Sequence, residues 1–372
     1  MNQNQKQSTR NETERFALFI LLFTIIEIGL LIFMLTSHLL PKNWKWGSPD
    51  PEVPTEEQTT QGEDTTQPPE QSVPVFSGGA LPIAPVVSSQ TQTLGSEIAS
   101  NYALLFDTQT GTVVASKNAN ARFSPASMTK VMTLIVACEN LTEADLERKL
   151  VMTQEIHDYA RTGNYVDSSA AGHDVGDEIR IKDLLYGIGV ESASDCTALI
   201  VFELCGSEAE FVALMNQKAT ELGLTQTHFD NAIGYDSEDN YTTACEMGMI
   251  FSYAMQCDLI KDILSVTSYR FEAYYYKDGV YSPFGFTYYS TLFRSRMETY
   301  EKHSGKAFSL STATLEAGKT GYLESSFLAC QAKGKSNSRY ILILGDATGS
   351  SAGLACYYTM RDVKYVLDTY VS

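Results

Sequence analysis

The longest continuous run of apolar residues lies near the start of the chain, from Phe16 to Leu35. Its length of about 20 residues is what an α-helix needs to cross a bilayer. The run exceeds the apolar core of a cleaved signal peptide and no small-residue cleavage site follows it, although cleavage is the alternative interpretation. Three cationic residues precede it, which favours a cytoplasmic N-terminus at 1–15. We expect a single-pass membrane anchor over 16–36, with the rest of the chain outside the cytoplasm.

The next segment, 37–95, lacks hydrophobic periodicity and is rich in Pro, Thr, Gln, Ser and Glu. From Gly47 to Ser96 seven side chains are acidic and none is basic. Such a composition buries too little apolar surface to offset the entropy of ordering the chain. We therefore expect a disordered acidic linker over 37–95 that holds the following domain away from the membrane.

From about residue 96 the pattern becomes globular and continues to residue 372. Short apolar runs bounded by turn residues predict strands at 102–106, 112–116, 269–276, 326–332 and 340–345. Helical periodicity predicts helices that follow Pro125 as far as Cys138 and that cover 181–190, 197–204, 208–222 and 360–370. Strands at both ends with helices between them indicate an α/β sandwich with an added helical region.

Composition excludes several classes of function. The formal net charge of −18 argues against a nucleic-acid partner, because phosphate binding needs a basic patch. The seven cysteines show no C-x-x-C spacing, and the five histidines are scattered without a metal-ligand motif. We expect no metal and no cofactor. The cysteines are interpreted as small buried apolar residues, with one disulfide pair left open as an alternative.

The first candidate for chemistry is Ser127-Met128-Thr129-Lys130, close to the start of the helix that follows Pro125. Residues three apart on a helix face the same way, so the amine of Lys130 can reach the hydroxyl of Ser127. A desolvated lysine can be neutral and can serve as the base that activates a serine. The helix N-terminus also favours negative charge that develops there.

Two further elements accompany this pair. Lys319-Thr320-Gly321 leads toward an apolar strand, where a cation and a hydroxyl can hold a carboxylate and the glycine admits a substrate backbone. The alternative for this tripeptide is a surface turn. Ser192-Ala193-Ser194 lies in the break between two predicted helices, where Ser194 or Asp195 could simply supply an N-cap.

In this order, the three elements resemble those of the penicillin-binding protein and serine β-lactamase superfamily. The resemblance is closest to the low-molecular-mass D-alanyl-D-alanine carboxypeptidases of the S11 peptidase type. It covers about residues 100–372 and includes PASMTKVMT, DLLYGIGVESASD, GSEAEFVALMNQKATELGLTQTHFDNAIGY and EAGKTGY. The resemblance implies a transpeptidase-like fold, in which an antiparallel sheet is sandwiched by helices beside a helical subdomain.

The resemblance also implies a reaction, with Ser127 as the acylated nucleophile, Lys130 as its proton acceptor and Ser192 as the relay of a proton to the leaving group. The substrate would be a peptidoglycan stem peptide ending in D-Ala-D-Ala. β-Lactam antibiotics would acylate the same serine.

The remaining motif residues would bind this substrate. Lys319 and Thr320 would hold its terminal carboxylate, with Gly321 beside them. The backbone N–H groups of Ser127 and Tyr322 would form the oxyanion hole.

One position departs from the family pattern, because Ser194 stands where the family has Asn. A hydroxyl is shorter than an amide and does not offer the same donor and acceptor pair. We hypothesise a slower or differently tuned enzyme, an idea that unchanged turnover and acylation in Ser194→Asn would refute. The same departure keeps open a catalytically weakened wall-binding or regulatory protein.

Other interpretations carry less weight. A β-lactamase of class A would add an E-x-x-L-N stretch, which is absent between Ser194 and Lys319. Gly349 to Gly353 fits the G-x-S-x-G pattern of α/β-hydrolases, but no histidine follows Ser351 to complete a triad. Many relatives carry a further β-domain and an amphipathic anchor at the C-terminus. We expect the N-terminal span to replace that anchor.

Overall fold

The computed structural model describes residues 73–166, 168–277 and 280–372. The cytoplasmic segment expected at 1–15, the anchor expected at 16–36 and the first half of the expected linker lie outside these ranges. Over the ranges that are described, no helix combines the length and the apolarity needed to span a bilayer. Residues 73–372 belong to one compact unit.

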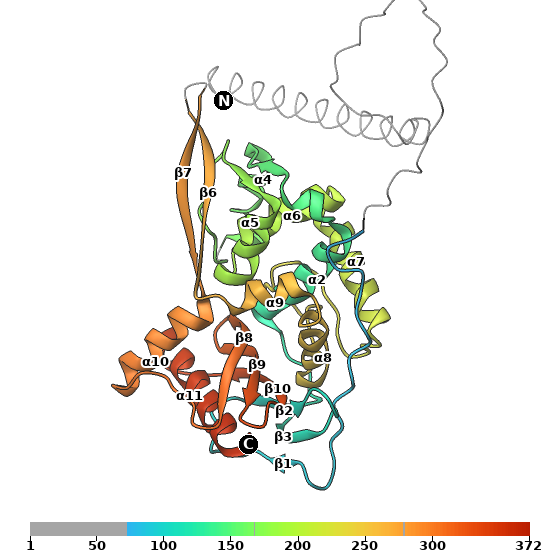
Figure 1. Cartoon of the computed structure of the whole chain (residues 1–372), viewed down its shortest axis with the longest axis vertical. Coiled ribbons are helices and arrows are strands. Elements are labelled where there is room, and N and C mark those ends of the chain that lie inside the picture. Colours follow the sequence, from blue (N-terminus) through green and yellow to red (C-terminus); the bar gives the residue numbers. More distant parts are fainter. Residues whose placement is uncertain (1–72, 167, 278–279) are drawn as a thin grey trace, which may run out of the picture. The chain divides into compact units, whose positions relative to one another are not determined.

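The larger sheet has six strands in the described chain, in the order β1-β3-β2-β10-β9-β8 (Figure 1). All neighbouring strands are antiparallel except β1 and β3. The strands are β1 (Gln92–Thr93), β2 (Tyr102–Asp107), β3 (Val113–Lys117), β8 (Ala313–Tyr322), β9 (Ser326–Gly334) and β10 (Arg339–Ala347). The strands predicted at 102–106 and 112–116 and the two predicted C-terminal strands are confirmed. The sheet ends at β8, so the Lys319-Thr320-Gly321 motif lies on an edge strand.

Both faces of this sheet are buried, and for that reason its central strands are apolar at nearly every position. Leu104 and Phe106 of β2 pack into a core shared with the helical region. Leu105, between them, points to the opposite face and packs with Val363 and Leu367. Side chains alternate across a strand, so one apolar run contributes to both cores.

Helices cover the two faces. On one face lie α10 (Met297–Ser304) and α11 (Ala352–Tyr370), and on the other lie α2 (Lys130–Asn140) and α8 (Ala244–Ala254) (Figure 1). The remaining helical segments are η1 (Ala126–Thr129), α3 (Glu143–Leu146), α4 (Gln154–Tyr159), η2 (Gly163–Tyr165), α5 (Ile181–Tyr186), η3 (Gly187–Glu191), α6 (Ser194–Cys205), α7 (Glu208–Glu221), α9 (Asp258–Ser265) and η4 (Thr291–Arg296). The α/β sandwich and the added helical region are both confirmed.

The helix predicted at 181–190 is two segments, because α5 ends at Tyr186 and continues as the π-helical turn η3. Close packing occurs along this turn. A Cβ at Gly187 would lie 2.5 Å from Cys196 Sγ, and one at Gly189 would lie 2.2 Å from Ile263 Cγ2. The turn ends at Ser192, whose backbone is left-handed with φ +63°. The helices predicted to begin at 197 and 360 begin earlier, at Ser194 and Ala352.

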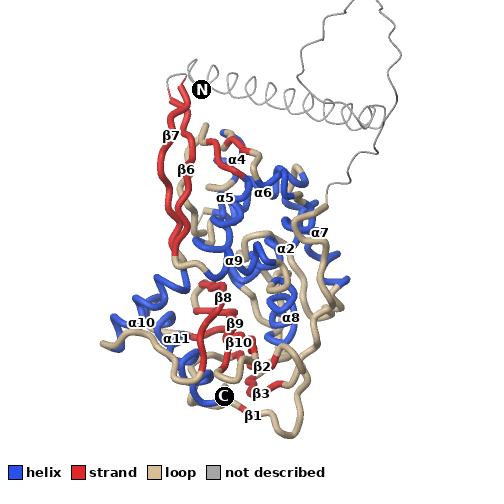
Figure 2. Tube along the Cα trace, in the orientation of Figure 1, coloured by secondary structure: helices blue, strands red, loops and turns tan. Residues whose placement is uncertain are grey.

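A second sheet escaped sequence prediction except for one strand. Its order is β4-β5-β6-β7, with β4 (Lys149–Val151), β5 (Glu178–Arg180), β6 (Ser268–Lys277) and β7 (Val280–Tyr289). Pro283 and Gly285 interrupt the strand pattern of β7, and proline is tolerated there because β7 is an edge strand. Strands β6 and β7 form a long hairpin that projects from the body of the unit (Figure 2).

Residues 73–95, expected to form the second half of the linker, instead pack on the domain, and we call them the N-terminal strap. Phe76 is buried and its backbone N–H donates to Cys138 O at 2.9 Å. Its ring lies 5.2 Å from that of Tyr253. Farther along, β1 pairs with β3. A few apolar residues within a Pro-rich stretch are enough to anchor it. The linker prediction missed them because it rested on the average composition of the segment.

All seven cysteines lie in the described chain as free thiols, and five of them are buried. The interpretation as small buried apolar residues agrees with this arrangement. The disulfide left open by the sequence is not formed in this structure.

Candidate active site

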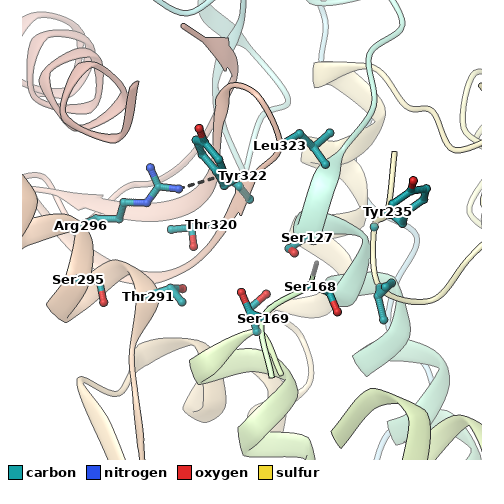
Figure 3. A pocket seen from close by; sticks show the side chains of 14 residues that line it. Ser127, Ser168, Ser169, Tyr235, Thr291, Ser295, Arg296, Thr320, Tyr322 and Leu323 are labelled. Carbon is teal, nitrogen blue, oxygen red and sulfur yellow. Dashed lines mark hydrogen bonds between the residues drawn. The ribbon is translucent and has the colours of Figure 1, made fainter. Parts of the chain in front are cut away.

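A pocket of about 460 Å³ opens where the larger sheet meets the helical region. Its walls come from segments far apart in the sequence: η1, the loop between η2 and β5, the end of η3, the turn after α7, η4 and the end of β8 (Figure 3). The lining residues are Ser127, Ser168, Ser169, Ser192, Ile233, Gly234, Tyr235, Thr291, Ser295, Arg296, Thr320, Gly321, Tyr322 and Leu323.

Ser127 lies in the 3-10 turn η1, directly before the helix that starts at Lys130. Lys130 Nζ lies 3.3 Å from Ser127 Oγ and donates to Ile233 O at 2.7 Å. The lysine is fully buried, and loss of hydration lowers its pKa to about 7, against the opposing charge of Asp195. A substantial fraction of Lys130 is therefore neutral near neutral pH, as a base for Ser127 must be.

The backbone at Ser127 is held between two glycines. Ala126 has φ +52°, an unfavourable conformation for a residue with a Cβ. A Cβ on Gly234 would lie 1.8 Å from Ala126 O, and one on Gly321 would lie 3.2 Å from Ser127 N. Strand β8 and the turn at 231–235 therefore both run directly against the backbone of Ala126 and Ser127, where only glycine fits.

The turn at 231–235 is itself fixed by a buried side chain. Asn231 Oδ1 accepts hydrogen bonds from the backbone N–H groups of Ile233 (3.3 Å), Gly234 (2.7 Å) and Tyr235 (2.9 Å). The turn places Ile233 O where Lys130 donates to it. In the sequence, only the family resemblance pointed to the stretch that contains this turn.

Ser192 and Lys319 meet at the back of the pocket. Lys319 Nζ donates to Ser192 Oγ at 2.8 Å and to Thr320 O at 2.9 Å. The lysine is fully buried, and its pKa lies well below its ordinary value, mainly through desolvation and further through the charges of Lys130 and Arg296. Ser192 lines the pocket together with Ser127, whereas Ser194 is not among the lining residues.

Arg296, on η4, is a buried cation that sequence analysis missed. Its Nη1 donates to Ser326 Oγ at 2.5 Å and its Nη2 donates to Gly321 O at 3.0 Å (Figure 3). It lines the pocket together with Thr320. Nothing local marks this residue, because the segment 291–296 carries no motif and reaches β8 only through the fold.

Ser194 is buried outside the pocket. Its backbone N–H and its hydroxyl both donate to Ser169 O, at 2.8 and 2.7 Å, and it accepts from Ser168 Oγ at 2.7 Å. The N-cap of α6 is Ala193, so Ser194 is not the cap that the sequence allowed. Ser168 and Ser169, absent from the sequence prediction, line the pocket instead.

The remaining predicted residues divide as follows. The pocket brings together Ser127, Ser192, Thr320, Gly321 and Tyr322, with Lys130 and Lys319 hydrogen-bonded behind them. By contrast, Ser351 of the G-x-S-x-G stretch is exposed, and its side chain caps α11 by accepting from Leu354 N–H at 3.3 Å.

A family model for D-alanyl-D-alanine carboxypeptidase matches residues 87–324. The chain is 35% identical over 151 residues to D-alanyl-D-alanine carboxypeptidase DacF of Bacillus subtilis, a match that covers 40% of this chain and 37% of DacF. It is 31% identical over 199 residues to the D-alanyl-D-alanine carboxypeptidase of Streptomyces sp. K15, covering 51% of this chain and 64% of that protein. The chain thus matches less than two thirds of the length of either relative.

Solved structures have the same fold. The crystal structure of the Streptomyces K15 DD-transpeptidase superposes with a TM-score of 0.59 at 23% identity, covering 73% of this chain and 97% of that one. Penicillin binding protein 5 from Haemophilus influenzae gives a TM-score of 0.56 at 20% identity, covering 74% and 71%. Because the family model matches more than half of the chain, this chain belongs to the peptidase S11 family of D-alanyl-D-alanine carboxypeptidases.

Proposed function

We propose that this chain is a serine carboxypeptidase that removes the terminal D-Ala from peptidoglycan stem peptides through an acyl-enzyme at Ser127. The observation that carries the proposal is the distance of 3.3 Å between Lys130 Nζ and Ser127 Oγ. The pKa of about 7 for Lys130, lowered by burial, gives this amine the proton affinity that a general base needs. Family membership supports the same reaction.

In the proposed acylation, neutral Lys130 takes the hydroxyl proton of Ser127 while Oγ bonds to the carbonyl carbon of the penultimate D-Ala. The tetrahedral intermediate then collapses and the bond to the terminal D-Ala nitrogen breaks. Ser192 passes its proton to that nitrogen, which leaves as the amine, and the proton that Lys130 took from Ser127 replaces the one that Ser192 gave. Water attacks the acyl-enzyme in the second half and restores Ser127. The N–H groups of Ser127 and Tyr322 would stabilise the oxyanion in both halves.

The leaving D-Ala carries a carboxylate. This carboxylate would bind on the β8 side of the pocket. Thr320 supplies a hydroxyl there, Arg296 supplies a buried guanidinium, and Lys319 supplies an amine whose protonated form would add positive charge. Gly321 leaves room for the substrate backbone beside the edge strand. A guanidinium holds a carboxylate well, because its planar donors match the two oxygens.

The proposal includes the location of the enzyme. The apolar run at 16–36 would anchor the chain as a single span, and the catalytic domain 96–372, extended by the strap, would face the cell wall. Alkaline extraction of membranes should leave the full chain in the membrane fraction, and external protease should reach residues after the span. Release of the protein into the soluble fraction would remove the anchor from the proposal.

The activity is tested by incubating the full chain with a labelled penicillin and, separately, with a peptide that ends in D-Ala-D-Ala. We expect one label on Ser127, none in Ser127→Ala, and release of D-Ala from the peptide. Label without D-Ala release would favour the penicillin-binding alternative without carboxypeptidase activity. Rapid hydrolysis of the penicillin would favour a β-lactamase, and label that survives in Ser127→Ala would overturn the assignment of the nucleophile.

A further inference from the structure

Asp195, directly after Ser194, is fully buried in the first turn of α6 but bonds mainly outside its own helix. Its carboxylate accepts from the backbone N–H groups of Ala171 (2.9 Å), Gly172 (2.8 Å) and His173 (3.2 Å). Only one bond, from Cys196 N–H at 2.9 Å, lies within α6. The carboxylate therefore serves the preceding loop more than its own helix.

The same loop is held a second time at its other end. Ser194 donates twice to Ser169 O and accepts from Ser168 Oγ. Two consecutive residues of α6 thus fix residues 168–173, which we call the serine loop. Residues 168 and 169 of this loop form part of the pocket wall that also contains Ser127 and Ser192 (Figure 3).

We infer that Asp195 is a positioning residue for the acyl-transfer pocket, which clamps the serine loop so that the Ser168 and Ser169 hydroxyls form one wall beside Ser127. The inference rests on the proposed function. It explains what replaces the missing amide at position 194: the Ser194 hydroxyl holds the loop, and the loop supplies the polar groups. A buried carboxylate with four N–H donors is fully solvated by protein and does not need a cation partner.

The charge of Asp195 also reaches Lys130, where it raises the pKa against the larger lowering by desolvation. Other charges surround the pair. Lys319 lies on the β8 side, and the charge of Lys130 helps to lower its pKa. Glu191, whose pKa is raised mainly by burial, lies on the η3 side near Asp195. His173 completes the set from the serine loop. The acylation rate should rise with pH as Lys130 loses its proton, and we call this rise the acid limb. Removal of the Asp195 charge should therefore move the acid limb to lower pH, a shift that a merely structural residue would not produce.

The test compares the full-length wild type with Asp195→Asn by labelling with a fluorescent penicillin across pH. We expect the second-order acylation constant to fall about 10–100-fold, as for a wall displaced by about 1 Å, and the acid limb to move to lower pH. The matched control is Asp362→Asn on α11, which removes a fully buried carboxylate that accepts from the backbone N–H and the hydroxyl of Ser100, both at 2.8 Å, and has no bond to the serine loop. This control should keep the wild-type rate and limb.

A second variant keeps the test decisive if Asp195→Asn does not fold. The double variant Ser168→Ala and Ser169→Ala leaves every Asp195 bond in place, and we expect its acylation to slow at least several-fold with no shift of the limb. Wild-type acylation in the double variant, or a wild-type rate and limb in folded Asp195→Asn, would overturn the inference. If the wild type itself takes no label, the proposed function is wrong, whereas the inference about Asp195 can still be tested. The clamp is then tested by amide exchange at 171–173, which must accelerate in Asp195→Asn.

Discussion

Lys319 Nζ donates to Ser192 Oγ at 2.8 Å, although 127 residues separate them in the chain. Because Lys319 is the donor in this bond, Ser192 uses an oxygen lone pair here and keeps its own proton for another acceptor. In the proposed reaction, this proton is the one that Ser192 passes to the leaving amine. This relationship links the β8 edge to η3 and closes the pocket on one side.

The pH dependence of acylation should report Lys130. Only the neutral amine can take the Ser127 proton, so acylation should rise with pH through about 7 and level off above it, because burial lowers the Lys130 pKa to that value. The second-order rate of penicillin labelling between about pH 5 and 9 measures this limb. Lys130→Arg, permanently charged, should lose at least about 10²-fold in rate. A limb near the ordinary pKa of lysine would contradict the assignment.

Arg296→Lys should weaken binding of substrates with a free terminal carboxylate. The substitution keeps a charge but removes the fork that joins Ser326 Oγ and Gly321 O. We expect KM for such a peptide to rise about tenfold, or about 1.4 kcal/mol, with a smaller change in kcat. The neighbouring Arg294→Lys, where the side chain is exposed and paired with Glu298, is the control and should leave KM unchanged. Equal effects in the two variants would exclude a special role for Arg296.

Gly234→Ala should abolish acylation, because its Cβ would lie 1.8 Å from Ala126 O and push the nucleophile segment aside. Displacement of this size costs at least about 10²-fold in rate. Gly206→Ala is a matched control, since Gly206 also has positive φ (+72° against +81°) but a Cβ there meets no atom within 4 Å. The control should lose about 1 kcal/mol of unfolding free energy and keep its acylation rate. Similar labelling rates in the two variants would contradict the packing argument.

Phe76→Ala should destabilise the domain if the N-terminal strap belongs to it. The ring is 7% exposed and packs on Tyr253, so truncation leaves a cavity and should cost about 3–5 kcal/mol of unfolding free energy. Urea unfolding of the full chain measures the loss. Leu81→Ala, at a strap position that is 69% exposed, is the control and should change stability by no more than about 0.5 kcal/mol. No loss in Phe76→Ala would restore the original expectation of a disordered linker through residue 95.

Much of the site could be predicted from the sequence where its geometry is local. Ser127 and Lys130 are three residues apart on one helical turn, so their contact follows from helix geometry alone. The central strands of the larger sheet were also predictable. Because both faces of the sheet are buried, β2, β9 and β10 are apolar along most of their length. Prediction failed at β7, where Pro283 and Gly285 broke the pattern, and at the strap, where Phe76 is one apolar residue in a polar stretch.

The sequence by itself determined the motif residues, their order and the class of fold. The tertiary structure alone decided that Lys319 meets Ser192, that Arg296 reaches β8, and that Asp195 holds the serine loop. The physical reason is that these hydrogen bonds join residues more than 20 positions apart in the chain, and such contacts leave no periodic signal in the sequence. Within a helix, the spacing of residues in the sequence determines which side chains are neighbours. The neighbours of a loop residue are determined only when the chain has folded.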